Sequence, residues 1–232
     1  MNQPELVRRL SEYAEPSYAL FSLKLQVSDR TIMGVRTPHL TTLARSLAKT
    51  EGVQALLDFY SYESPSYEEV IVIYKLFGLL RLHPDEGLSL LVRLLPYNES
   101  WATNDTLAGS LSHLSQQDST LYPFLLALLK SPHPYEQRLG IVSLMLHFLD
   151  APTFDEVLDA WSKVESDHYY VIMALGWGYA SAYCKNREKT LEYLQRGRLQ
   201  ESVRRKAIQK CIESRIPSEA EKHMLRALRS AP

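Results

Sequence analysis

The sequence predicts an all-α protein, a solenoid of stacked helical repeats without a β-sheet. Apolar residues recur at helical spacing along nearly the whole chain. Helix-start signals and prolines divide these runs into short helices, and no set of segments alternates with period two between hairpin turns. Pairs of short helices recur at roughly 35–40 residues, a spacing typical of repeats whose neighbours stack into one continuous core.

Start signals and apolar runs define the individual helices. Capping boxes, in which two residues three apart satisfy each other's backbone N–H, are expected at 66–69, 153–156 and 218–221. Apolar side chains follow at helical spacing, for example over 70–80 and 141–148. The expected helices are 3–13, 17–27, 38–49, 51–61, 67–82, 85–95, 100–115, 119–129, 135–149, 154–164, 168–184, 187–195, 201–213 and 219–229.

Composition indicates an ordinary globular protein of the cytoplasm. The chain has 232 residues, 45% hydrophobic and 23% charged, and nothing in it marks a linker, so one domain over residues 1–232 is expected. No apolar run reaches membrane-span length, and the N-terminus lacks an apolar signal core. Cys184 and Cys211 lack metal-ligand spacing and are expected to be reduced thiols. We expect a monomer with no metal, no cofactor and no membrane contact.

The near-neutral net charge hides an asymmetry. Residues 1–184 carry 13 basic and 21 acidic side chains, whereas residues 185–232 carry 13 basic and 6 acidic ones, a net charge of +7. Such a basic end suggests a surface for a polyanion, although solvated terminal helices would give the same composition. Arg204, Arg205 and Lys206 lie in one expected helix there and are candidate phosphate contacts.

Trp101 and Asp105 are the most informative pair of residues. They are four apart, so they share one face of the expected helix 100–115. An aromatic face beside a carboxylate suits a cationic ligand or a cationic transition state. Arg138 and Trp177 lie on two further expected helices. If they converge on the same place, the chain holds an aromatic cleft with one acid and one fixed cation.

Six short segments occur in a characteristic order over most of the chain. They are Ile32-Met-Gly-Val-Arg-Thr-Pro38, Tyr67-Glu-Glu-Val-Ile71, Ser100-Trp-Ala-Thr-Asn-Asp105, Tyr135-Glu-Gln-Arg-Leu-Gly-Ile141, Tyr169-Tyr-Val-Ile-Met-Ala-Leu-Gly-Trp177 and Val203-Arg-Arg-Lys-Ala-Ile208. In this order and spacing they resemble the bacterial AlkD-type alkylpurine DNA glycosylases. The resemblance implies a right-handed α-solenoid of HEAT-like (ARM-type) repeats that binds duplex DNA containing alkylated bases.

The resemblance also implies an activity and roles for four residues. The activity is hydrolysis of the N-glycosidic bond of cationic N3- or N7-alkylpurines, without base flipping. Trp101 and Trp177 match the cleft tryptophans, Asp105 the catalytic carboxylate and Arg138 the cleft arginine, which would bind a backbone phosphate. Bond breaking leaves positive charge on the deoxyribose, and each aromatic face would stabilise that charge by roughly 0.5–2 kcal/mol.

Alternative interpretations remain open at this stage. Trp101 and Trp177 could be core residues, Asp105 a helix cap and Arg138 part of an ion pair between repeats. Trp161 matches no motif and is expected to be packed in the core. At the level of function, the alternatives are a catalytically silent member of the superfamily that binds DNA or RNA, and a helical scaffold for protein partners.

Overall fold

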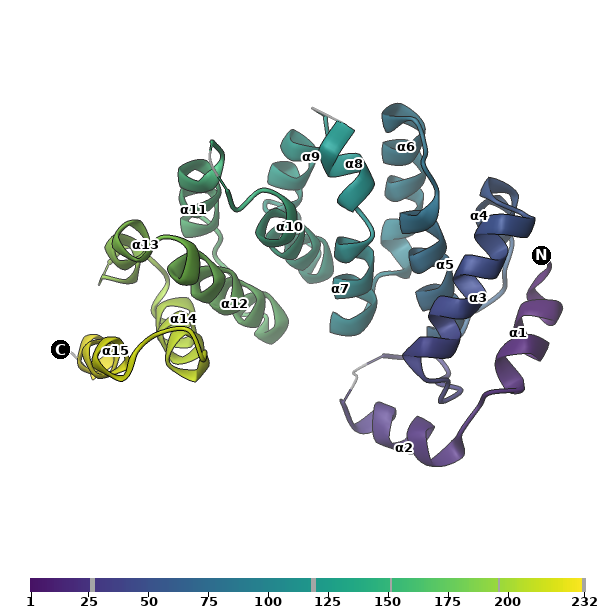
Figure 1. The fold of residues 1–232 in the computed structure, drawn as a ribbon, viewed down its shortest axis with the longest axis horizontal. Helices are drawn as coiled ribbons and strands as arrows, with labels where there is room; N and C mark the ends of the chain where they lie inside the picture. The colour runs from purple at the N-terminus through teal and green to yellow at the C-terminus, as the bar shows by residue number, and fades with distance from the viewer. Residues whose placement is uncertain (26–27, 118–119, 151, 196, 231–232) are drawn as a thin grey trace. The chain divides into compact units, whose positions relative to one another are not determined.

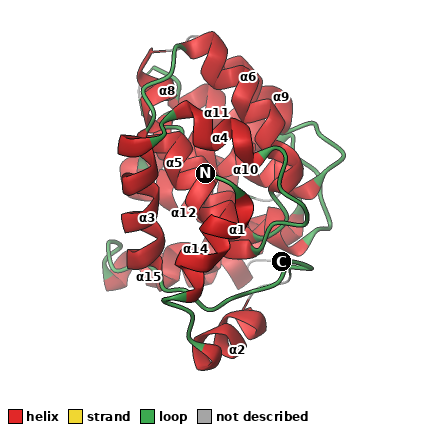
Figure 2. Cartoon of the chain, turned by 90° about the vertical axis from the view of Figure 1, so that its right-hand side faces the viewer, coloured by secondary structure: helices red, strands yellow, loops and turns green. Residues whose placement is uncertain are grey.

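The computed structural model describes residues 1–25, 28–117, 120–150, 152–195 and 197–230. These residues form helices joined by loops (Figures 1 and 2), and their one β-type contact is an isolated bridge between Ala14 and Val35. The prediction of an all-α helical-repeat fold is therefore confirmed. No helix in the described ranges has both the length and the apolar character needed to cross a membrane.

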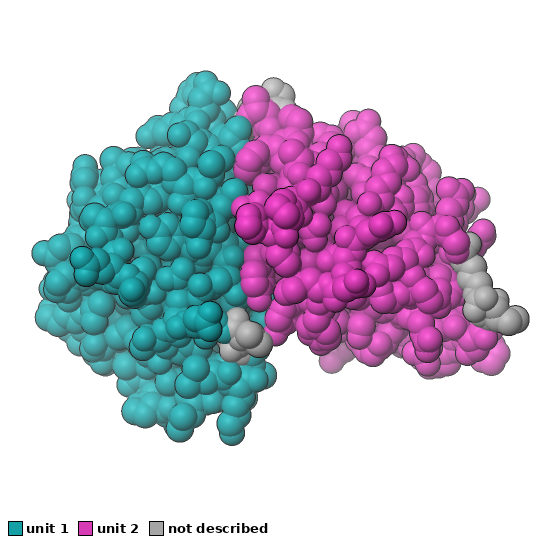
Figure 3. Space-filling model, turned by 180° about the vertical axis from the view of Figure 1, so that it is seen from behind, with its two compact units in different colours: residues 1–118 teal, residues 119–232 magenta. Residues whose placement is uncertain are grey.

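The chain divides into two compact units, residues 1–118 and 119–232 (Figure 3), which we describe separately. That the whole chain is one repeat domain stays a prediction.

The first unit is organised around the helix α5, which packs against α3 on one side and α7 on the other. Most of α5 is apolar, and its side chains from Val70 to Tyr74 are all buried. The helices of this unit are α1 (Gln3–Ser11), α2 (Pro16–Leu25), α3 (Thr37–Thr50), α4 (Val53–Phe59), α5 (Tyr67–Leu79), α6 (Pro84–Leu94), the 3-10 turn η1 (Leu95–Tyr97), α7 (Trp101–Gly109) and α8 (Ser112–Gln117).

In the second unit, α12 packs between α10 and α14 in the same way. Two glycines of α12 allow close packing: a Cβ at Gly176 would lie 2.5 Å from Cγ of Lys206, and one at Gly178 would lie 2.8 Å from the ring of Trp161. The helices of this unit are α9 (Leu121–Leu128), α10 (Pro134–His147), α11 (Phe154–Ser162), α12 (Tyr169–Lys185), α13 (Arg187–Leu194), α14 (Glu201–Glu213) and α15 (Glu219–Ser230).

Two of the three expected capping boxes are present. At 66–69 and at 218–221 the serine hydroxyl accepts the glutamate N–H, and the glutamate carboxylate accepts the serine N–H. The prediction of a capping box at 153–156 is wrong. The hydroxyl of Thr153 donates instead to the carbonyl oxygens of Phe148 and Asp150, so it does not cap α11.

The expected helix 100–115 is in fact two helices, α7 and α8. The hydroxyls of Thr106 and Ser110 each donate to the carbonyl oxygen four residues earlier, at 2.8 Å, and such bonds compete with the helix ladder. The flexible Gly109 precedes the break. Residues 26–27, at the end of the expected helix 17–27, and residue 119, at the start of another, lie outside the described residues.

Replacing Gly140 of α10 by Ala is expected to destabilise the protein, whereas the same change at Gly109 stabilises it. A Cβ at Gly140 would lie 2.8 Å from the carbonyl oxygen of Leu125, and such overpacking typically costs about 1–3 kcal/mol. Nothing lies within 4 Å of a Cβ at Gly109, so Ala there gains roughly 0.5–1 kcal/mol of helix propensity. Urea unfolding measures both free energies, and equal stability of the parent and the Gly140→Ala protein would contradict the close contact.

Candidate active site

Trp101 and Asp105 line one groove in the first unit, as their spacing predicts. The groove has a volume of about 390 Å³ and lies among α2, α3, α5 and α7. Both side chains are half-buried, so neither belongs to the core. The indole N–H of Trp101 donates to the carbonyl oxygen of Leu25, at 3.0 Å. This bond fixes one edge of the ring while the rest of the ring borders the groove.

A buried capping network fixes the start of α7, which carries both residues. Ser100 and Thr103 are fully buried and exchange hydrogen bonds, each side chain accepting the other's backbone N–H, at 3.2 and 3.1 Å. The hydroxyl of Thr103 also lies 3.4 Å from the side-chain oxygen of Asn98. Because these residues directly precede or begin α7, they set the position at which Trp101 enters the groove.

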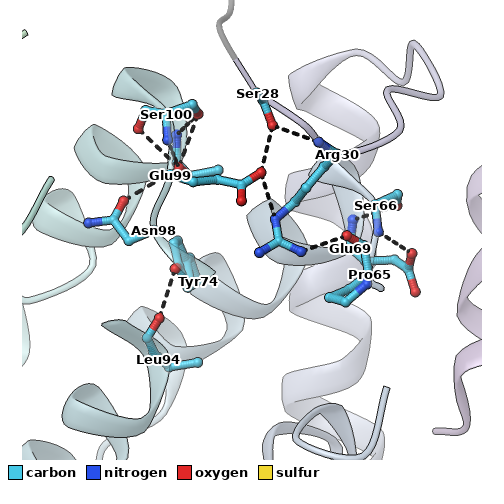
Figure 4. Close-up of polar contacts among 11 residues, drawn as sticks. Ser28, Arg30, Pro65, Ser66, Glu69, Tyr74, Leu94, Asn98, Glu99 and Ser100 are labelled. Carbon is cyan, nitrogen blue, oxygen red and sulfur yellow. Dashed lines mark hydrogen bonds and ion pairs between the residues drawn. The ribbon is translucent and has the colours of Figure 1, made fainter. Parts of the chain in front are cut away.

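A second set of polar contacts ties this helix start to the segment that follows α2 (Figure 4). The guanidinium of Arg30 forms an ion pair with Glu99, at 3.0 Å, and donates to the carbonyl oxygen of Pro65. The hydroxyl of Ser28 donates to the same carboxylate, at 2.8 Å. The side chain of Arg30 therefore connects its own segment to Pro65 and to Glu99, close to the start of α5.

The loop before α3 is held by the buried carboxylate of Glu68, which lies in the first turn of α5. This carboxylate is 1% exposed and accepts the backbone N–H groups of Met33, Gly34 and Val35, at 2.9, 2.7 and 3.2 Å. Gly34 has φ +84°, and a Cβ there would lie 2.3 Å from the carbonyl oxygen of Glu15. Only glycine fits at this position, so the fold itself requires the glycine in the segment 32–38. Glu68 was not predicted from the sequence, where its signal was a second acid beside the capping Glu69.

A second cavity of about 370 Å³, lined by α3, α5 and α7, adjoins the first. We call the first cavity, which Trp101 borders, the inner part of the groove and the second the outer part. Lys75, Asp105 and Thr106 border both parts, and Arg45 borders the outer one. Burial lowers the pKa of Lys75, and the positive charge of Arg45 lowers it further. Lys75 was not predicted from the sequence either, where its signal was a lone cation within the apolar run of α5.

Arg138 and Trp177 lie on α10 and α12 of the second unit, two helices that pack together. Arg138 is 5% exposed, and its Nη1 donates to the carbonyl oxygen of Tyr170, at 2.7 Å. Trp177 is 40% exposed, unlike Trp161, which is 1% exposed and packed as predicted. Convergence of this pair with Trp101 and Asp105 on a single cleft stays a prediction.

The surroundings of Arg204 do not favour the predicted contact with DNA. Its side chain is fully buried and donates to the carbonyl oxygens of Leu194 and Leu228, at 2.9 and 2.6 Å, with Glu201 as its ion-pair partner. It therefore ties α13, α14 and α15 together. Arg205 is exposed and Lys206 half-buried, so their phosphate contacts stay predictions.

The other side chains considered for chemistry are the two cysteines and the possible metal ligands. Cys184 and Cys211 are free thiols, and burial raises the pKa of Cys211 to about 12, which disfavours a nucleophilic thiolate. The described residues contain no group of three or more His, Cys, Asp or Glu side chains suited to a metal ion.

Replacing the two tryptophans of the second unit separates a core ring from an exposed ring. Trp161→Ala is expected to lower the free energy of unfolding by about 3–5 kcal/mol, the usual cost of removing a packed aromatic side chain. Trp177→Ala should cost clearly less, because its ring is 40% exposed. Denaturant unfolding of both variants gives the two values. Equal losses would mean that Trp177 is a core residue, as the alternative interpretation held.

No curated protein matches the chain. A family model described as "DNA alkylation repair enzyme" matches residues 6–211. That description names an enzyme that acts on DNA in alkylation repair, in agreement with the resemblance found in the six segments. Because the match covers most of the 232 residues, the protein belongs to the family of DNA alkylation repair enzymes.

Proposed function

We propose that the protein is a DNA glycosylase that hydrolyses the N-glycosidic bond of cationic N3- or N7-alkylated purines in duplex DNA. The observation that supports this most directly is the placement of Trp101 and Asp105 on one wall of the same groove, one helical turn apart. The family membership supports DNA as the substrate. The AlkD-type resemblance adds that the base stays unflipped.

In the proposed reaction, the bond between C1′ and the purine nitrogen breaks, and its electron pair neutralises the cationic purine. The deoxyribose becomes oxocarbenium-like, and a water oxygen forms the new bond to C1′. Asp105 orients that water, accepts its proton and attracts the sugar cation. The face of Trp101 stabilises the same cation through its quadrupole, by roughly 0.5–2 kcal/mol.

The surroundings of the pair support these roles. The indole N–H of Trp101 already has the Leu25 carbonyl as its acceptor, so the ring needs no polar group of the substrate at that edge. Asp105 lies midway along α7, where the two parts of the groove meet. A nucleotide in the inner part would therefore have the aromatic ring and the carboxylate on one side. The AlkD-type resemblance gives Trp177 the role of an aromatic contact and Arg138 that of a phosphate contact, and both roles stay predictions.

Asp105→Asn is expected to slow base release far more than it weakens DNA binding. Loss of one preorganised electrostatic group typically costs about 100–1000-fold in rate, whereas the amide keeps the size of the side chain. Single-turnover release of N7-methylguanine or N3-methyladenine from duplex DNA measures the rate. Asp85→Asn on α6, whose carboxylate is 85% exposed and outside the groove, is the matched control.

Equal release rates for the parent and Asp105→Asn would remove Asp105 from the mechanism. Binding of methylated duplex without base release by the parent protein would favour the catalytically silent member instead.

Arg205→Ala is expected to make binding to undamaged duplex less dependent on salt. Each phosphate contact contributes about 0.9 to the slope of log affinity against log salt, and Arg205 is the exposed arginine of α14. Arg204 is unsuitable for this test because its removal would leave buried carbonyl groups without a donor. Binding titrations at several salt concentrations measure the slope, and an unchanged slope would mean that Arg205 does not contact DNA.

A further inference from the structure

Two cations of neighbouring helices border the outer part of the groove. They are Arg45 on α3 and Lys75 on α5, and α3 packs against α5. The charged groups of both side chains form no ion pair and no hydrogen bond with the residues that the structure describes. Asp105 borders the same part of the groove, and the positive charge of Arg45 disfavours the protonated form of Lys75.

Several arginines of this unit have carboxylate partners. Arg8 pairs with Glu5 at 2.9 Å, and Arg36 pairs with Glu15 at 2.7 Å. Arg30, which is largely buried, pairs with Glu99. Arg45 and Lys75 have no such carboxylate partner among the described residues, although Lys75 is half-buried, where an uncompensated charge is costly. An unneutralised pair of this kind attracts an anion.

The outer part of the groove extends along α7 from Asp105 to Gly109. The helix rises about 6 Å over these residues, roughly two nucleotide steps for a DNA strand that runs along α7. Gly109 is exposed and has nothing within 4 Å of where its Cβ would be, so the groove is open there. A lysine supplies a compact charge, and an arginine supplies a fork of donors suited to a phosphate.

We propose that Lys75 and Arg45 bind a backbone phosphate of duplex DNA, one or two nucleotides from the one placed at Trp101 and Asp105. The placement of that nucleotide rests on the proposed function, but the phosphate contact itself requires only that the groove binds DNA. It gives this groove its own anchor on the backbone, on the Gly109 side of Asp105.

The test is the salt dependence of binding to an undamaged duplex of mixed sequence, measured with the full-length protein. Lys75→Met keeps most of the side-chain length and removes the charge, and Arg45→Gln changes an exposed residue. The double variant is expected to lower the log–log slope by about 0.9, the contribution of one phosphate, and each single variant by part of that amount. Lys75→Arg should restore the parental slope, because it restores the charge.

Arg93→Gln is the matched control, because Arg93 lies on α6, 3.7 Å over the ring of Tyr60 and outside the groove. Its slope should equal that of the parent. A double variant that melts like the parent and keeps the parental slope would overturn the proposal. If Lys75→Met fails to fold, Arg45→Gln alone decides, with the same criterion.

Two further measurements distinguish the phosphate contact from a site for free anions and from the proposed glycosylase activity. Inorganic phosphate is titrated in parallel; loss of phosphate binding in the double variant with an unchanged slope on DNA would indicate a site for free anions and overturn the proposal. Base release is measured separately. A parent protein that releases no alkylated base, with a lowered slope in the double variant, would refute the glycosylase and leave the phosphate contact standing.

Discussion

The groove depends on one buried carboxylate, that of Glu68. Taking a charged carboxylate out of water costs several kcal/mol unless hydrogen bonds replace the lost solvation. Here three backbone N–H groups of the loop before α3 do so, and the first turn of α5 adds a favourable helix dipole. Because the same side chain belongs to α5 and binds the loop that leads into α3, it fixes two walls of the groove relative to each other. The capping network at Ser100 then places the third wall, α7.

Because α5 is almost entirely buried, few of its side chains can reach the groove. A helix packed on several sides must be apolar nearly all round, and α5 follows this rule from Val70 to Phe77 with Lys75 as its charged exception. The aliphatic stem of a lysine can cover apolar surface while its ammonium reaches solvent. A cation therefore emerges from an otherwise closed helix at the place where the groove passes it. The same packing keeps Tyr74 inside, with its hydroxyl donating to the Leu94 carbonyl.

The sequence was sufficient for the helices and for one pair of site residues, and the limits of that success are physical. Local periodicity and capping predicted most helix ranges, because these depend on neighbours in the chain. Spacing also placed Trp101 and Asp105 on one face. By contrast, Arg204 was assigned to the surface because charge counting cannot detect the Leu194 and Leu228 carbonyls that tertiary packing brings to it. Lys75 was overlooked for the complementary reason: its neighbour Arg45 is thirty residues away in the sequence.

Lys75 and Arg45 border the same groove as Asp105. Phosphate binding and breaking of the glycosidic bond would therefore be coupled in the proposed reaction. A positive charge about 5–6 Å from the sugar would oppose a developing sugar cation by about 3 kcal/mol at an effective dielectric constant near 20. Lys75 and Arg45 would oppose it in the same sense, by an amount that depends on their distance, whenever their charges were uncompensated. A bound backbone phosphate would cancel it and leave the field of Asp105 to act on the sugar. The same contact that anchors the strand would then lower the barrier, so a short substrate lacking that phosphate would lose rate as well as affinity.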